Sequence, residues 1–389
     1  MSHHYSHLQS SIAILQSYQP GEPFVHFIKK YFSNHKKFGS KDRKKISALC
    51  YYYFRTHCLL GSIPMDEAII KAYFLCESNP SAFLEDRAPS LNEKVSLSAK
   101  EKLSYLGLNE LQLFPYKENL TDSIDAAAFA ISFLQQPLLF IRTRPGKHAK
   151  VMAALAQQEI IFQLLSPNTL ALENRKALPE SLTVNKDFVV QDASSQMVFN
   201  ATNEKGWLTT TNKPLKVWDC CAASGGKSLL IYDLLHKNIQ LTVSDIRKNI
   251  LQNLQQRLQY AGITLYKTFV ADLEKGATQE VEAEFDLVIC DAPCTGSGSW
   301  CRTPEHLAFF EKCSIELYAK KQAKIAYNAS AGVKPGGLFF YITCSIFENE
   351  NEAVVKQLST DTGMQVLQMQ YIKGYEHNAD SMFVAVLKK

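Results

Sequence analysis

The sequence predicts an α/β fold, in which a parallel sheet with helices on both faces follows a helical N-terminal part. Three observations support this prediction. Apolar residues recur at helical spacing from residue 5 to about 130, short strands alternate with helices from about residue 205, and the 389-residue length suits two or three domains. Hydrophobic residues make up 46% and charged residues 21%, which excludes a wholly disordered chain.

The elements fall into three expected domains. Residues 1–130 form a helical domain, in which Leu8, Ile12 and Leu15 show the spacing of one buried helix face. Residues 135–200 form a small mixed α/β domain, and residues 205–389 carry the parallel sheet. The small domain contains an apolar run, a helix-like stretch and two further extended runs, at residues 138–141, 148–158, 162–165 and 169–172.

The composition also limits the compartment and the ligands. No run of about 18 apolar residues appears, and MSHHYSHLQSS lacks the basic start and apolar stretch of a signal peptide. The ten cysteines include no CxxC pair, so free thiols are expected rather than disulfides or a metal site. We therefore expect a cytoplasmic monomer without membrane or metal partners.

Positive charge is concentrated between residues 24 and 60. Nine Lys and Arg stand there against one acid, Asp42, so this stretch carries +8 while the whole chain carries +4. Aromatic residues alternate with these cations, a mixture that suits nucleic acid, although a solvated helical face remains the alternative. The cations are Lys29, Lys30, Lys36, Lys37, Lys41, Arg43, Lys44, Lys45 and Arg55.

A glycine loop and a series of acids indicate a cofactor site. The expected strand 215–219 runs into DCCAASGGKS, whose small residues let the backbone approach a ligand. Asp219, Asp245, Asp272 and Asp291 each end a predicted strand, where ligands bind in such folds. A P-loop would need glycine at Cys221, so an NTPase is the weaker interpretation. An acid for ribose hydroxyls without a phosphate cradle suits S-adenosylmethionine.

Two cysteines are candidates for covalent catalysis. Cys294 follows the fourth expected strand in DAPCTGSGSW, and Cys344 follows the fifth in FFYITCS. The C5 carbon of a pyrimidine is a poor nucleophile, and a thiolate that adds at C6 activates it toward a methyl donor. A base must then remove the C5 proton before the thiolate leaves. The alternative, that both are small buried hydrophobic residues, applies better to the other cysteines.

At these motifs the chain resembles the RsmB, Nop and NSun group of RNA 5-cytosine methyltransferases. The resemblance is carried by VVQDASSQMV, DCCAASGGKS, SDIRKN, VICDAPCTGSGSWCRTPE and YITCSIFENENEAVV, in this order along the chain. It implies a Rossmann-like class I methyltransferase sheet of seven strands with an antiparallel final strand near 382–387. It also implies that residues 135–200 are a ferredoxin-like RNA-binding subdomain, and that the substrate is RNA, with ribosomal RNA expected.

The resemblance also implies roles for individual residues. Cys344 would be the nucleophile and Cys294 would help release the product. Asp291 would also lie near the target base, and Lys227 is the leading cation beside the nucleophile. The residues expected to bind S-adenosylmethionine are Cys221, Ala222, Ala223, Ser224, Gly225, Gly226, Lys227, Asp245, Asp272 and Asp291.

Three positions depart from the family pattern, with Ser224 in place of proline, Cys301 in place of arginine and Thr143 in place of asparagine. Two further alternatives belong to other classes. A catalytically silent RNA-binding protein would not need both thiols. A DNA cytosine methyltransferase would use Cys294 as its nucleophile and would not need Cys344.

Overall fold

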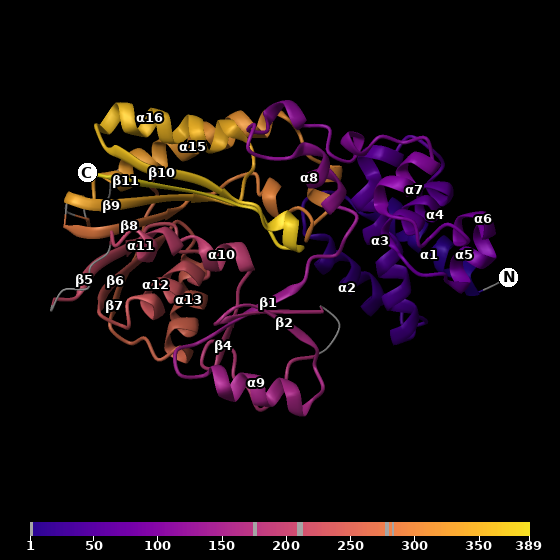
Figure 1. Ribbon diagram of the computed structural model, residues 1–389, viewed down its shortest axis with the longest axis horizontal. Coiled ribbons are helices and arrows are strands. Elements are labelled where there is room, and N and C mark those ends of the chain that lie inside the picture. The colour runs from indigo at the N-terminus through magenta and orange to yellow at the C-terminus, as the bar shows by residue number, and fades with distance from the viewer. Residues whose placement is uncertain (1–2, 174–176, 208–212, 277–279, 282–283) are drawn as a thin grey trace. The chain divides into compact units, whose positions relative to one another are not determined.

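The computed structural model describes residues 3–173, 177–207, 213–276, 280–281 and 284–389 (Figure 1). The chain divides into two compact units. The first comprises Met1–Gln136 together with Ser299–Lys312, and the second comprises Pro137–Gly298 together with Cys313–Lys389. A short segment after the fourth strand of the large sheet therefore belongs to the helical unit.

The first unit is helical, as the apolar spacing predicts. Phe24 of α2 and Phe54 of α3 pack edge to face in its core, with ring centroids 4.8 Å apart. Glu305 belongs to the inserted segment and accepts a hydrogen bond from Phe24 N at 3.1 Å, at the start of α2. Its helices are α1 (His3–Ser17), α2 (Phe24–Asn34), α3 (Ser40–Leu60), α4 (Met65–Cys76), α5 (Ala82–Arg87), α6 (Pro89–Asn92), α7 (Ala99–Tyr105), α8 (Ala126–Ser132) and α14 (Glu305–Ala308).

One of the nine cations between residues 24 and 60 is structural. Arg55 is 2% exposed and donates to Phe133 O at 2.9 Å, Gln135 O at 3.0 Å and Gln136 Oε1 at 2.6 Å. Its guanidinium therefore satisfies carbonyls beyond the end of α8 and is not available to a ligand. The lysines of this stretch, by contrast, are all exposed.

The second unit begins with a small antiparallel sheet of order β2-β3-β1-β4. Helix α9 (His148–Gln157) connects β1 to β2 and packs Val151 and Leu155 against the sheet. This strand order and the single crossover helix place a ferredoxin-like sheet where the sequence predicts it. The strands are β1 (Leu139–Thr143), β2 (Phe162–Ser166), β3 (Thr169–Leu172) and β4 (Phe188–Val190).

The large sheet has seven strands in the order β10-β11-β9-β8-β5-β6-β7. The five strands from β9 to β7 run parallel, and β11 runs antiparallel to both of its neighbours, as expected for the final strand. The strands are β5 (Leu215–Asp219), β6 (Ile239–Asp245), β7 (Tyr266–Val270), β8 (Phe285–Asp291), β9 (Val333–Thr343), β10 (Gln365–Ile372) and β11 (Met382–Lys388).

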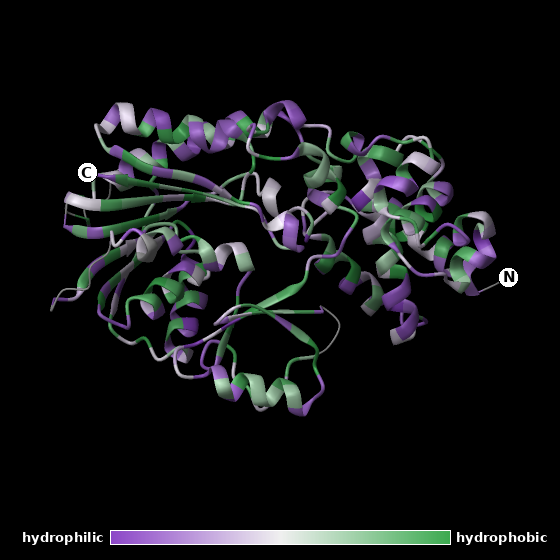
Figure 2. Ribbon diagram, viewed as in Figure 1, coloured by the Kyte–Doolittle hydropathy of each residue, from purple (hydrophilic) through white to green (hydrophobic). Residues whose placement is uncertain are grey.

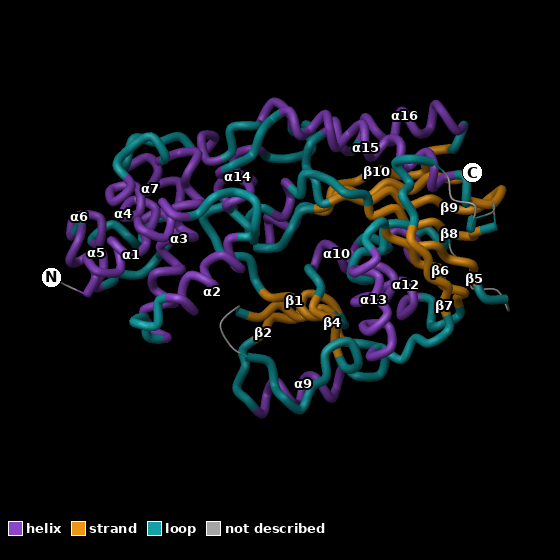
Figure 3. Tube along the Cα trace, turned by 180° about the vertical axis from the view of Figure 1, so that it is seen from behind, coloured by secondary structure: helices purple, strands orange, loops and turns teal. Residues whose placement is uncertain are grey.

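Helices cover both faces of this sheet, which explains why its central strands are continuously apolar (Figures 2 and 3). Along β8, Leu287 and Ile289 face the layer of α12 and α13, whereas Val288 and Cys290 face the layer of α15 and α16. Among the described residues, no helix is long and apolar enough to cross a bilayer. The helices are α10 (Ala193–Met197), α11 (Asn200–Glu204), α12 (Gly226–Leu234), α13 (Lys248–Tyr260), α15 (Cys313–Ser330) and α16 (Glu352–Thr362).

A buried ion cluster joins the small sheet to the large one. Asp233 on α12 accepts hydrogen bonds from Arg142 at 2.7 Å and from Arg144 at 2.6 Å, and all three side chains are at most 7% exposed. Arg142 Nε also donates to Gln191, whose amide donates to the carbonyl of Gly226. Because α12 begins at Gly226, the small sheet is connected directly to the loop that the sequence assigns to the cofactor.

Candidate active site

A cavity of about 360 Å³ opens at the carboxyl ends of the parallel strands. Its wall combines apolar side chains with four carboxylates and two cations, so it suits a ligand with both apolar and hydroxyl groups. The lining residues are Cys220, Cys221, Ala223, Asp245, Ile246, Arg247, Ala271, Asp272, Leu273, Glu274, Asp291, Pro293, Lys321 and Ile325.

The loop between β5 and α12 makes a tight turn that brings backbone amides to this cavity. Ala223 and Gly225 have positive φ angles of 44° and 80°. A Cβ at Gly225 would lie 3.2 Å from Leu254 Cγ, so a side chain there would be both strained and crowded. Arg257 Nη1 donates to Ser224 O at 2.9 Å and to Ser224 Oγ at 3.0 Å. The serine that replaces the family's proline thus acquires a partner from α13.

Asp245 ends β6 and faces the loop between β5 and α12. Its Oδ2 accepts from Ala223 N at 3.0 Å, and both of its oxygens accept from Arg247. Burial opposes ionisation, but the hydrogen bonds from Arg247 outweigh it and lower the pKa of Asp245. Asp272 lies two residues beyond β7, lines the same cavity and pairs with Lys275 at 3.0 Å. Both acids are therefore ionised acceptors in the cavity wall.

Asp219, at the end of β5, is completely buried. Its Oδ2 accepts from Ser228 Oγ at 2.6 Å, whereas its Oδ1 has no hydrogen-bond partner among the described residues. Burial raises the pKa of Asp219 to about 7, and the nearby charge of Asp291 adds to this effect. Asp219 therefore does not line the cavity but binds Ser228 in the first turn of α12, which follows the loop.

The two candidate catalytic thiols meet. Cys294 Sγ and Cys344 Sγ lie 3.3 Å apart, although 50 residues separate them in the chain. They follow the adjacent parallel strands β8 and β9. The contact with Cys344 and then burial raise the pKa of Cys294, and either sulfur can be the donor in this contact.

Lys227 lies with its ammonium 2.8 Å from Asp291 Oδ2. Burial opposes its charge, but Asp291 outweighs burial and raises the pKa of Lys227, with Cys344 and Asp219 acting in the same direction. The first turn of α12 thus supplies a fixed positive charge beside the thiol pair. Asp291 both pairs with Lys227 and lines the cavity.

Glu350, which the sequence analysis does not single out, holds both thiol loops. Its buried carboxylate accepts from Thr295 N at 2.9 Å, Thr295 Oγ1 at 2.5 Å and Ser345 Oγ at 2.7 Å. Gln322 donates to the same carboxylate at 2.9 Å and to Pro293 O at 3.0 Å. This carboxylate therefore binds Thr295 and Ser345 directly, which follow Cys294 and Cys344 in the chain. It is linked through Gln322 to Pro293, which precedes Cys294.

Gly298 packs against the other side of the Cys344 loop. Its amide donates to Cys344 O at 2.8 Å, and a Cβ there would lie only 2.1 Å from Ser381 O.

The two remaining departures from the family pattern lie elsewhere. Cys301 is buried in the helical unit, and Thr143 hydrogen-bonds Asn168 within the small sheet. In the described structure neither side chain lines the cavity.

The profile of the 16S rRNA methyltransferase RsmB/F family matches residues 206–388. This stretch holds the cofactor loop, both thiols and every strand of the large sheet. Residues 206–388 thus match an RsmB/F-family methyltransferase domain. The matched range includes the residues that line the cavity, the Lys227–Asp291 pair and the thiol pair.

Curated relatives agree with the RsmB/F domain. A probable ribosomal RNA small subunit methyltransferase B from Synechocystis is 25% identical over 328 residues, which cover 78% of this chain and 71% of that protein. Ribosomal RNA small subunit methyltransferase B from Xanthomonas campestris is 28% identical over 282 residues, 68% of this chain and 62% of that protein. The match to a Bacillus subtilis relative spans only 37% of its length.

Solved structures share the fold. The crystal structure of PH0851 aligns over 100% of both chains with a TM-score of 0.71 at 19% identity. NSun6 from Pyrococcus horikoshii, solved with SFG, aligns over 71% of this chain and 97% of its own with a TM-score of 0.59 at 16% identity. The predicted Rossmann-like methyltransferase architecture is confirmed.

Proposed function

We propose that this protein transfers a methyl group from S-adenosylmethionine to the C5 carbon of a cytosine in ribosomal RNA. The observation that carries the proposal is the contact between Cys294 and Cys344 at 3.3 Å, beside the Lys227–Asp291 pair. One thiol suffices to activate a pyrimidine, and a second one in contact with it is suited to the proton movement that ends the reaction.

The cavity fits the methyl donor better than it fits a nucleotide triphosphate. Asp245 and Asp272 are ionised acceptors suited to ribose hydroxyls, and Ile246, Leu273 and Pro293 provide an apolar wall for the adenine ring. Four carboxylates in the lining oppose phosphate groups. The donor supplies an electrophilic methyl group, and the SFG of the NSun6 structure is an analogue of this donor.

The side chains then have distinct tasks. The Cys344 thiolate forms a bond to C6 of cytosine, and the electrons of the C5–C6 double bond move to C5, which accepts the methyl group. Lys227 holds a positive charge next to the sulfur, and Asp291 links Lys227 to the cofactor cavity. A base then removes the C5 proton, the double bond re-forms, and the C6–sulfur bond breaks. Cys294, in contact with Cys344, assists this release.

The helical unit and the small sheet are proposed to bind the RNA. In the helical unit, Lys29, Lys30, Lys36, Lys37, Lys41, Lys44 and Lys45 are exposed, and in the described structure none of them forms an ion pair. Of the three aromatic side chains between these lysines, Phe32 is buried, and Tyr31 and Phe38 are half-buried. Binding through phosphates is therefore favoured over base stacking on this surface.

The test is methyl transfer from labelled S-adenosylmethionine to small-subunit ribosomal RNA of the organism that makes this protein. The modified nucleoside is then identified by nucleoside analysis. The expected product is 5-methylcytosine, and it should disappear with Cys344→Ala. Label in any other nucleoside, or binding of ATP without binding of S-adenosylhomocysteine, would contradict the proposal.

A further inference from the structure

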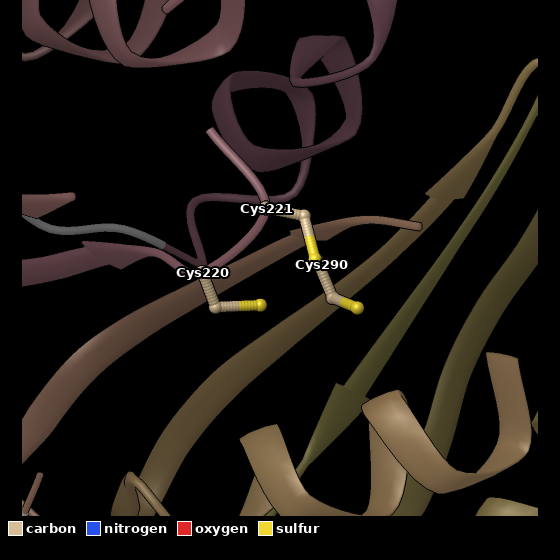
Figure 4. Close-up of side chains that lie close together, drawn as sticks. All are labelled: Cys220, Cys221 and Cys290. Atoms are coloured by element: carbon tan, nitrogen blue, oxygen red, sulfur yellow. The ribbon is translucent and has the colours of Figure 1, made fainter. Parts of the chain in front are cut away.

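Three more cysteines meet beside the cofactor cavity, and the proposed reaction does not use their sulfurs (Figure 4). Cys220 and Cys221 follow β5, and Cys290 is the penultimate residue of β8. The Sγ atoms of all three lie within 4.8 Å of one another. Cys220 N donates to Ile289 O at 2.9 Å, so the backbone already holds the two segments together.

The three sulfurs lie close enough together to coordinate one metal ion in a trigonal site. A metal–sulfur bond of about 2.3 Å places three sulfurs in one plane about 4.0 Å apart. The three sulfurs lie within 4.8 Å of one another, so small side-chain adjustments would bring them to this spacing. Structural zinc sites take four ligands, whereas soft thiolates favour monovalent copper. Within the part of the chain that the structure describes, no fourth His, Cys, Asp or Glu joins the group.

We propose that Cys220, Cys221 and Cys290 form a binding site for a thiophilic monovalent d10 cation, of which Cu(I) is the example. Each thiol that coordinates the ion releases its proton to water in the cavity, and the copper remains monovalent, so no electron acceptor is needed. The sequence shows no metal motif here because the ligands are a vicinal pair and a distant residue in a neighbouring strand, and only the fold brings them together.

The cavity provides the route of entry. Cys220 and Cys221 line it, and the carboxylates of Asp245, Asp272 and Asp291 in the same wall attract a cation. An ion held by these thiolates would occupy the wall against which the methyl donor is proposed to bind. Copper and the donor should therefore exclude each other, a consequence that rests on the proposed function, whereas the copper site itself does not.

Anaerobic titration with the chromophoric Cu(I)–bicinchoninate complex tests the site. Cys344→Ala serves as the parent, because it removes the other pair of neighbouring thiols. The parent should withdraw one equivalent of copper, and adding Cys290→Ser should abolish this binding. Cys313→Ser is the matched control, because Cys313 is an exposed thiol outside the group, and it should leave the equivalent in place. Equal binding by the Cys290→Ser protein would overturn the proposal.

X-ray absorption of the loaded parent protein gives a test that does not depend on the folding of any Cys290 variant. Three sulfur ligands on Cu(I) are expected, and two sulfurs or nitrogen ligands would overturn the assignment. Calorimetry of the parent protein with S-adenosylhomocysteine then tests the competition. One equivalent of Cu(I) should abolish the binding heat. Unchanged binding would refute the overlap of the two sites, whereas absence of binding without copper would refute the proposed function.

Discussion

Replacing Glu350 by alanine should separate the thiol loops and slow the reaction. The change removes the carboxylate that accepts from the half-buried amide of Thr295, whereas Gln322 keeps its bond to Pro293 O at 3.0 Å. Ser345 Oγ lies 3.1 Å from Ser297 Oγ, so its hydroxyl can find another partner. We therefore expect the free energy of unfolding to fall by about 2 to 3 kcal/mol. Most of this loss comes from the lost hydrogen bond of the Thr295 amide. Because the loop that carries the nucleophile Cys344 loses the contact of Ser345 Oγ with the carboxylate, adduct formation should fall on the order of tenfold to a hundredfold.

The assay is single-turnover formation of the protein–RNA adduct, alongside urea unfolding. Tyr341→Phe is the matched control, because it removes a buried hydrogen bond to Glu350 O at 2.6 Å but leaves the contacts of the carboxylate intact. It should destabilise the protein without changing the adduct rate. Glu350→Gln keeps one acceptor oxygen and should recover part of the rate. Equal rates for Glu350→Ala and the wild type at a temperature where both are folded would refute the reasoning.

Three further predictions concern the cofactor loop and the helical unit. Because burial raises the pKa of Asp219 from 3.8 to about 7, the native state holds a proton that the unfolded state releases, so stability should fall by about 3 kcal/mol between pH 5 and pH 8. Asp219→Asn should flatten this decline in urea unfolding, and an unchanged decline would assign it to other groups. Arg257→Ala removes the two hydrogen bonds to Ser224. In calorimetry it should weaken S-adenosylhomocysteine binding by about 1 kcal/mol, roughly fivefold. Unchanged affinity would show that these hydrogen bonds do not help the loop to bind the ligand. The last prediction concerns neutral replacements of the exposed residues Lys36, Lys37, Lys41, Lys44 and Lys45. These replacements should reduce the salt dependence of RNA binding without changing the affinity for the methyl donor. An unchanged salt dependence would show that this stretch is only a solvated helix face.

Much of the fold was predictable because its signals are local. The strand 215–219 was expected with the bounds of β5, and the run 382–387 is β11 to within one residue. Apolar runs bounded by turn residues mark buried strands, and the alternation of strands and helices indicates a parallel sheet. The acids at the strand ends could be ordered along the chain for the same reason, since the carboxyl ends of parallel strands share one edge.

The contacts that hold the site together were not predictable from local patterns. Glu350 stands in the acidic run ENEN, where a solvated acid is the ordinary expectation, and only the fold buries it between the two thiol loops. Arg257 reaches Ser224 across 33 residues, from a helix whose sequence indicates only an amphipathic surface. Arg55 counts as a cation in the sequence but serves as a buried donor in the structure. In these cases the contact joins residues that are distant in the chain. Composition and local spacing therefore do not predict it.

The most direct test of the central claim is a denaturing gel of protein incubated with substrate RNA and S-adenosylmethionine. Cys344 bonds to C6 before methyl transfer and Cys294 assists release afterwards, so Cys294→Ala should give a covalent band of retarded mobility. Cys344→Ala and the double variant should give none. A band with Cys344→Ala and none with Cys294→Ala would reverse the two roles and contradict the account.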